Sequence, residues 1–368
     1  MIRVHEKNKS LAGKQGKAPG SRNRNQKIDY GPSAGQLAWR RFRRHKGAIV
    51  GISFITFFVL VAILAPILSP YEPTEQNRQL LLRECGGLPP GQFGAAHPCG
   101  PITEVPSDSR LVGHCIRPEV LIWECGLHPL GTDQLGRDIL TRVMYGGRVS
   151  LIVGFVAALA ATLLGAMLGG FAAFFGGRID VLISRFIDIM LSIPTLPLLL
   201  ITSGLLATSD AAFIKNMRAA LGDSESIVII ILVIVLLSWM STARLVRGEI
   251  LSLRERDFIQ AAHSMGFSKL RIIVRHLLPN TMHLIIVQAT LWVGDAILTE
   301  SGLSFLGFGI KEPTVSWGNM LAMAQDLIFQ PNGIFVALFP GICIFLTVLC
   351  FNFLGDGLRD ALDPRGRR

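Results

Sequence analysis

Six separate runs of apolar residues, each about as long as a membrane is thick, dominate this sequence. They cover residues 47–68, 149–175, 189–207, 224–245, 282–302 and 334–354. A bilayer core needs roughly 20 apolar residues per helix, so each run is long enough to cross it. Half of the chain is hydrophobic (50%) and only 17% is charged, a composition unlike that of an ordinary soluble domain. The sequence therefore predicts an all-α polytopic membrane protein with six transmembrane helices.

The distribution of basic residues predicts the orientation. Six crossings place both termini on one side, and most of the 36 Lys and Arg residues fall on that side, including the run RRFRRHK at 40–46 beside the first apolar run. Cytoplasmic segments carry this excess, so both termini are expected in the cytoplasm. The first run is not a cleavable signal peptide, because a long polar tail precedes it. Membrane topology and contact with lipid explain the net charge of +10, and no nucleic-acid-binding motif accompanies it.

The polar loop at residues 246–281 carries a helical pattern of its own. Its apolar residues recur at helical spacing in two sets: Leu251, Phe258, Ala262 and Met265, then Leu270, Ile273, Val274 and Leu277. The first set predicts a helix from about Glu249 that Gly266 ends. Ser268 then caps a second helix, which Pro279 is expected to end. By periodicity alone this is an amphipathic hairpin lying on the membrane surface.

The identity of the loop residues indicates a more specific function. The EAA signature of ABC importer permeases reads E-A-A, three residues, G, nine residues, then I-x-L-P. This loop resembles it at Ala261, Ala262, Gly266, Leu278 and Pro279, with Gln260 in place of the Glu and His276 in place of the Ile. The resemblance implies that the loop forms a coupling helix, which inserts into a groove on an ATPase subunit.

Three further stretches resemble the C-type permeases of the dipeptide and oligopeptide transport family. They are HPLGTDQLGRDILTRVMYGGRVSL (128–151), LTESGLSFLGFGIKEPTVSWGNML (298–321) and FPGICIFLTVLCFNFLGDGLRDALDPR (339–365). The family implies the type I importer fold in a bacterial inner membrane. It also implies a second permease subunit as partner, two ATP-binding subunits and a periplasmic solute-binding protein. Nickel or another small solute is the alternative cargo to peptides.

The resemblance divides the chain into five segments. These are a basic tail (1–46), the first helix (47–68), a periplasmic loop with an insert (69–146), the transport domain (147–359) and a C-terminal tail (360–368). No phosphate-binding loop, H-E-x-x-H or G-x-S-x-G motif occurs, so the chain is expected to be no enzyme and to bind no cofactor or metal. ATP and Mg²⁺ would belong to the partner ATPase subunits.

Ionisable residues within apolar runs are candidates for the translocation path, because a charge in hydrocarbon is costly. Asp188, Asp295 and Glu300 qualify. Asp188 is interpreted as part of an ion pair or as a helix-end group. Asp295 and Glu300 are five residues apart, about 140° around a helix, so they cannot both face one partner. Glu300 is expected to contribute to an outer gate or to serve a structural hydrogen-bonding role.

Four of the six cysteines lie in the predicted periplasmic insert, at Cys85, Cys99, Cys115 and Cys125. An oxidising compartment favours two disulfides among them, with three possible pairings. A metal site that also uses His97, His114 and His128 is the alternative for this segment. Cys343 and Cys350 share a helix face and are interpreted as packing residues. A membrane sensor with a disulfide-bonded outer domain is the remaining alternative function.

Overall fold

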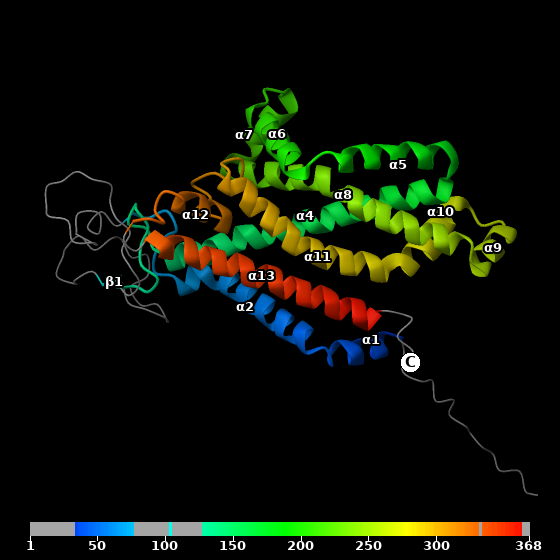
Figure 1. Cartoon of the computed structure of the whole chain (residues 1–368), viewed down its shortest axis with the longest axis horizontal. Helices are drawn as coiled ribbons and strands as arrows, with labels where there is room; N and C mark the ends of the chain where they lie inside the picture. The colour runs from blue at the N-terminus through cyan, green and yellow to red at the C-terminus, as the bar shows by residue number, and fades with distance from the viewer. Residues whose placement is uncertain (1–33, 77–102, 105–126, 331–332, 363–368) are drawn as a thin grey trace, which may run out of the picture.

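The computed structural model describes residues 34–76, 103–104, 127–330 and 333–362. Within these residues the protein is almost entirely helical (Figure 1). The exceptions are two short strands, β1 (Thr103–Glu104) and β2 (Leu127–His128), which pair antiparallel with Thr103 opposite His128. The predicted all-α class is therefore confirmed for the described part of the chain.

The helices fall into long apolar ones and short connecting ones. In chain order they are α1 (Ala34–Phe42), α2 (Lys46–Leu68), α4 (Ile139–Phe175), α5 (Gly177–Ser192), α6 (Thr195–Thr208), α7 (Ala212–Leu221), α8 (Glu225–Arg254), α9 (Asp257–Ser264), α10 (Lys269–Ile272), α11 (Leu278–Phe305), α12 (Trp317–Ala324) and α13 (Gly333–Leu362). Among the described residues, five continuous helical stretches are long and apolar enough to cross a membrane. These are α2, α4, α8, the stretch from α10 through α11, and α13.

The third predicted span is not one straight helix. Residues 189–207 are divided between α5 and α6, which together could form a sixth span but meet at an angle of 96°. The break lies at Ile193, which is extended (φ −85°, ψ 135°). Pro194 follows it, and a proline pushes the preceding residue out of the helical region. The expectation of a continuous third helix is therefore wrong, for a reason that is local to this dipeptide.

Glycines on α4 set how closely the central helices pack. A Cβ atom at Gly165 would collide with the backbone of Trp239, and one at Gly169 with the backbone of Ala243, both on α8. Only glycine permits such an approach between two backbones, a common device where membrane helices pack. α4 and α8 thus form the centre of the bundle, and the apolar core between them includes Val153, Ile234 and Met240.

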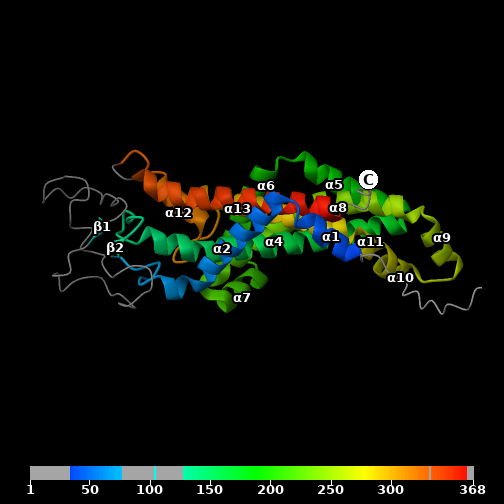
Figure 2. The same cartoon turned by 90° about the horizontal axis from the view of Figure 1, so that it is seen from below.

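The bundle is elongated, and its two ends differ in content. α9 lies at one end, whereas α12 and the two strands lie at the other, in both views (Figures 1 and 2). α1 and the last turns of α13 lie toward the α9 end (Figure 1). Between the ends, large apolar side chains such as Phe57, Ile63 and Phe345 are exposed on the outside of the bundle. A bilayer or a partner helix would cover them, which fits the predicted membrane span.

Cys343 and Cys350 are both free and lie on α13, Cys350 being buried. The carbonyl oxygen of Cys350 is so close to Gly51 of α2 that a side chain at position 51 would collide with it. Cys350 thus occupies a tight contact between α2 and α13, as expected of a packing residue. Cys85, Cys99, Cys115 and Cys125 lie outside the described residues, so the two disulfides in the insert stay a prediction.

Candidate functional site

The loop predicted to couple to an ATPase forms a compact corner, which we call the α9 loop (residues 255–277). Ile259 and Ala262 are buried and join an apolar cluster with Phe174 of α4 and Ile250 of α8. The ring of His263 stacks on Phe174, with 6.0 Å between ring centroids. These contacts attach one face of α9 to the ends of the two central helices. α9 is thus packed against both α4 and α8.

The predicted glycine corner and serine cap are both present. α9 ends at Ser264, and Gly266 has φ +77°, a conformation that side chains disfavour. The Ser268 hydroxyl accepts a hydrogen bond from the Arg271 N–H at 3.4 Å, as a helix cap does. A Cβ at Gly266 would meet no atom within 4 Å. Within this chain, glycine is therefore favoured at position 266 by its positive φ and not by a lack of space for a side chain.

Two boundaries of the predicted hairpin are wrong. The helix expected from about Glu249 is the last part of α8 followed by a separate α9, with a break at Glu255 and Arg256. Pro279 does not end the second helix, because a π-helical turn (Ile273–Leu277) leads directly into α11. Pro279 stands in the first turn of α11, where a missing N–H is tolerated. The Asn280 side-chain amide donates to the His276 carbonyl at 2.6 Å, which satisfies an acceptor beside the proline.

The signature residues of the α9 loop divide between inward and outward positions. Ala262 is buried in the cluster, whereas Ala261 and Gln260 are exposed, and the Gln260 amide donates to the Glu255 carbonyl at 3.2 Å. His276 stacks on Phe267, and Leu278 packs against the same cluster as Ala262. The alanine pair thus has one member packed against its own bundle and one member facing outward.

Large apolar side chains of the α9 loop remain exposed. They are Phe258 (43% exposed), Met265 (65%), Leu270 (57%) and Val274 (57%). All four come from the two apolar sets found in the sequence, whose other members include the buried Ala262, Ile273 and Leu277. The pattern therefore indicated helical structure, although with two wrong boundaries, and it mixed two faces: one that packs on the bundle and one that is exposed.

Asp295 and Glu300 on α11 lie in opposite environments. Asp295 is exposed on the surface of the chain, whereas Glu300 is fully buried. Glu300 accepts hydrogen bonds from the hydroxyls of Ser304 (2.8 Å), Ser316 (2.8 Å), Ser150 (3.3 Å) and Ser301 (3.4 Å). Ser150 belongs to α4 and Ser316 caps α12. Glu300 thus ties three helices together at the α12 end, while Asp295 is available to a neighbouring chain or to an aqueous path.

Asp188 forms an ion pair, which is one of the two roles that the sequence predicts for it. It accepts from Arg244 of α8 at 2.6 Å, and both side chains are exposed. Asp180, eight residues earlier on α5, makes a bidentate pair with Arg247, including a 2.8 Å contact to the second guanidinium nitrogen. These two pairs attach α5 to α8 in the half of the bundle that carries α9.

The α12 end contains a cluster of ion pairs around two buried arginines, which the sequence did not predict. Arg137 donates to Asp133 (2.7 Å) and to Glu312 (3.0 Å). Arg142 donates to Glu312 (2.7 Å) and to the Pro73 carbonyl (3.0 Å). The cluster joins the start of α4 to the segment after α11. Arg142 and Glu312 lie in two stretches that resemble the family, but no local signal relates one to the other.

Metal binding finds no support in the part of the chain that the structure describes, where no group of three His, Cys, Asp or Glu side chains is arranged to hold an ion. His128 is buried and contacts Asp138 at 2.9 Å, and Asp138 also caps α4 by accepting from the Thr141 N–H. His128 therefore serves a structural contact. His97 and His114 lie outside the described residues.

Taken together, the long apolar helices define a multi-pass membrane protein, and the α9 loop lies exposed at one end of it. The chain belongs to the family of binding-protein-dependent transport system inner membrane components, which matches residues 150–368. A second family, the N-terminal transmembrane domain of oligopeptide transport permease C, matches residues 33–90. The resemblance to importer permeases found in the sequence is thereby confirmed, and the chain is a membrane transport component.

Curated relatives match along nearly the whole chain. A dipeptide transport system permease protein (DppC) of Alkalihalophilus pseudofirmus is 39% identical over 89% of this chain and 89% of its own length. The DppC protein of Bacillus subtilis is 37% identical over 90% of this chain and 86% of its own. An oligopeptide transport system permease protein (OppC) of Haemophilus influenzae is 34% identical over 92% of this chain and 90% of its own.

Proposed function

We propose that this chain is the C-type permease subunit of an ATP-driven importer of di- or oligopeptides in a bacterial inner membrane. The observation that carries the proposal is the α9 loop: a signature-bearing corner, fixed to the two central helices on one face and apolar and exposed on the other. Peptides are the favoured cargo because the relatives are named as dipeptide and oligopeptide permeases. Nothing comparable favours nickel.

The complete importer requires other chains. A second permease subunit would cover part of the exposed apolar surface and form the translocation path together with this one. Two ATP-binding subunits would dock at the α9 loops, and a periplasmic solute-binding protein would deliver the cargo at the α12 end. ATP and Mg²⁺ would bind to the ATPase subunits, so this chain would transmit motion and catalyse no reaction.

The coupling mechanism follows from what α9 touches. An apolar helix face inserted into a groove binds in the manner of other helix-in-groove contacts. Closure of the ATPase subunits would pull on α9, and the packing of Ile259 and Ala262 would carry that movement into α4 and α8. Rotation of these helices about a central path then exposes the path to one side of the membrane at a time.

Orientation is the part of the proposal that a topology reporter tests directly. The α9 loop, with its Arg and Lys residues, is assigned to the cytoplasm, together with both termini. A reporter that is active only outside the cytoplasm should function when fused at about residue 110 or 215. It should fail at about residue 180 or 265. The opposite pattern would require that the orientation be reversed.

Association with ATPase subunits tests the docking role of the α9 loop. We expect that most of the ATPase subunits will no longer co-purify with Met265→Asp. Docking would bury the new carboxylate in an apolar groove of the ATPase subunit, where it would lose its contact with water. Phe329→Asp is the control, since Phe329 is 97% exposed and lies beyond α12, remote from α9. Equal recovery of the ATPase subunits with both variants would contradict the docking role. Co-purification of a kinase or response regulator instead would favour a membrane sensor.

The intramembrane acids are assigned different parts in transport. Asp295 is proposed to line the translocation path, because its carboxylate is exposed on a membrane-spanning helix and such groups mark aqueous pathways. Glu300 is proposed to contribute to the outer gate indirectly, by holding α12 and the segment before it through Ser304 and Ser316.

A further inference from the structure

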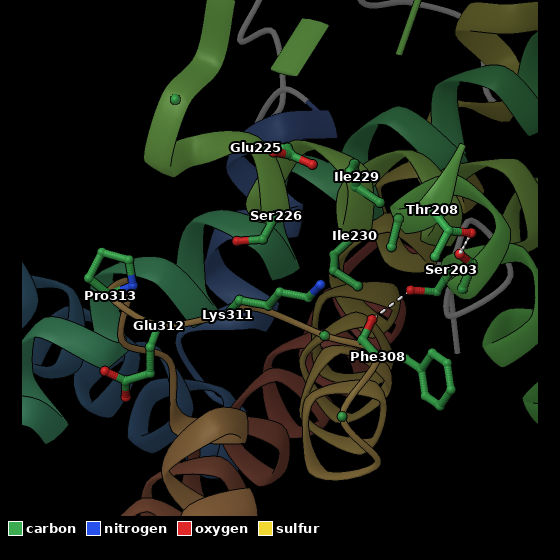
Figure 3. Close-up of a pocket in the computed structure, with 15 residues that line it drawn as sticks. Ser203, Thr208, Glu225, Ser226, Ile229, Ile230, Phe308, Lys311, Glu312 and Pro313 are labelled. Carbon is green, nitrogen blue, oxygen red and sulfur yellow. Dashed lines mark hydrogen bonds between the residues drawn. The ribbon is translucent and has the colours of Figure 1, made fainter. Parts of the chain in front are cut away.

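A cavity of about 390 Å³ opens between α6, the start of α8 and the segment 306–313 that follows α11 (Figure 3). This size falls within the usual range for small-ligand sites, about 300–1,000 Å³. Ile229 and Ile230 provide apolar lining, and Ser226 adds a hydroxyl. Of the elements that line the cavity, α6 lies beside α7, away from the α9 end of the bundle (Figure 1). Nothing in the proposed coupling mechanism uses it.

The two acids that line this cavity are paired, whereas Lys311 is not paired with any described residue. Two acids line it, and both have arginine partners: Glu225 contacts Arg218 at 2.7 Å, and Glu312 accepts from Arg137 and Arg142. The Glu312 carboxylate is directed away from the Lys311 ammonium (Figure 3). Within the described part of the chain, no acid lies within ion-pair distance of Lys311. The cavity therefore offers a cation without a counter-ion.

The backbone on both sides of Lys311 is held in place. The Ser203 hydroxyl donates to the Phe308 carbonyl at 2.6 Å, and the Ile310 N–H donates to the Ser304 hydroxyl at 3.1 Å. After Lys311, Glu312 is fixed by the two buried arginines. The Lys311 side chain projects into the cavity from this restrained segment (Figure 3). Such restraint lowers the entropy lost when a ligand binds.

We propose that Lys311 binds the C-terminal carboxylate of a peptide as it enters the translocation path. The inference rests on the proposed function and deepens it by naming the group that is recognised. Every unmodified peptide has this carboxylate, whatever its side chains are, so one lysine serves many sequences. The apolar lining formed by Ile229 and Ile230 does not select peptides by a particular polar side chain. Charge-assisted hydrogen bonds that the ammonium donates to the carboxylate supply the attraction.

Ligand-observed NMR on the assembled importer tests the proposal. The permease pair with its ATPase subunits is placed in nanodiscs without the solute-binding protein, and saturation transfer to dialanine and to dialanine amide is titrated. We expect dialanine to bind at least about tenfold more weakly to Lys311→Gln, the loss of one charged hydrogen bond. Lys311→Arg should retain binding. Lys215→Gln, which removes an exposed lysine of α7 outside the cavity lining, is the matched control.

The amide supplies a readout that needs no mutation. Dialanine amide lacks the carboxylate, so it should bind weakly to the wild type and equally weakly to Lys311→Gln. Equal affinity of wild type for the acid and the amide would overturn the proposal, even if Lys311→Gln failed to assemble. So would unchanged dialanine binding by an assembled Lys311→Gln importer.

Uptake by proteoliposomes separates this proposal from the proposed function. With the solute-binding protein and ATP present, the wild-type importer should accumulate labelled dialanine. If it accumulates no peptide, the proposed function fails. If it accumulates dialanine but shows no carboxylate preference in the binding titration, only the role of Lys311 fails.

Discussion

The two ends of this bundle are built in opposite ways. At the α12 end, buried charges and hydroxyls are matched within the chain: Arg142 and Arg137 pair with Glu312, and Glu300 accepts from four serines. At the α9 end, large apolar side chains such as Met265 and Leu270 are left exposed. The polar groups of the first end have partners within the chain, whereas the apolar side chains of the second end are exposed. This difference fits the proposed roles of the two ends, the α12 end as a rigid frame and the α9 end as a docking surface.

Arg142→Met should produce the largest effect, on the frame. The substitution leaves the Glu312 and Asp133 carboxylates with one guanidinium instead of two, and it removes the Arg142 hydrogen bonds to Glu312 and to the Pro73 carbonyl. A hydrogen bond to a charged group is typically worth about 1.5–3 kcal/mol. We expect the free energy of unfolding in detergent to fall by that order. Arg185→Met is the control, because Arg185 is exposed on α5. If the two variants unfold alike, the α12 end is not the rigid frame described above.

Glu300→Gln should produce the next largest effect. It also tests the difference between the buried Glu300 and the exposed Asp295 on α11. The amide nitrogen cannot accept from serine hydroxyls, so buried donors lose partners at about 1–3 kcal/mol. Thermal unfolding should therefore occur at a lower temperature. Asp295→Asn should leave stability unchanged, because Asp295 is exposed, and should alter peptide uptake at matched expression. Unchanged stability of Glu300→Gln together with altered uptake would assign Glu300 a direct role in the gate.

Gly266→Arg should affect the docking end with a smaller cost in stability. A non-glycine residue in the left-handed region is strained by roughly 1–2 kcal/mol, and the long side chain would also prop open the contact with an ATPase subunit. We expect the inserted protein to lose peptide uptake and ATPase stimulation. Gly248→Arg is the control, since that glycine lies within α8 and also has no atom within 4 Å of an added Cβ. Normal coupling by Gly266→Arg would contradict the assigned role of the corner.

Reduction of the predicted disulfides should have the smallest effect of these changes, and it should not affect the α9 end. Cys85, Cys99, Cys115 and Cys125 are expected to form two disulfides in a periplasmic insert that helps to dock the binding protein. Mass spectrometry of non-reduced, alkylated protein should find these four thiols protected. Reduction should weaken the response to the solute-binding protein and leave ATPase association unchanged. Free alkylated thiols at all four positions, or stoichiometric metal, would disprove the disulfides.

Much of the fold and part of the site followed from local sequence. The apolar runs located α2, α8, α11 and α13 closely, because each run is long enough to satisfy its own backbone in a bilayer. Gly266 and Ser268 were assigned correctly because a positive φ and a helix cap are properties of one or two residues. The bend before Pro194 is also encoded locally. The hydropathy of 189–207 continues across it, however, and therefore predicts a single helix.

Tertiary structure alone decided which residues of each pattern face inward and which distant groups meet. The periodicity that placed Ala262 and Met265 on one helix could not say that the first is buried and the second exposed. Arg142 and Glu312 are 170 positions apart and meet only because α4 and α11 pack side by side. The same packing pairs Glu312, the neighbour of Lys311, with Arg137 and Arg142, and so leaves the Lys311 ammonium without that acid as a partner. Sequence determines the helices because their hydrogen bonds are local, whereas burial and charge pairing depend on contacts that only the folded bundle creates.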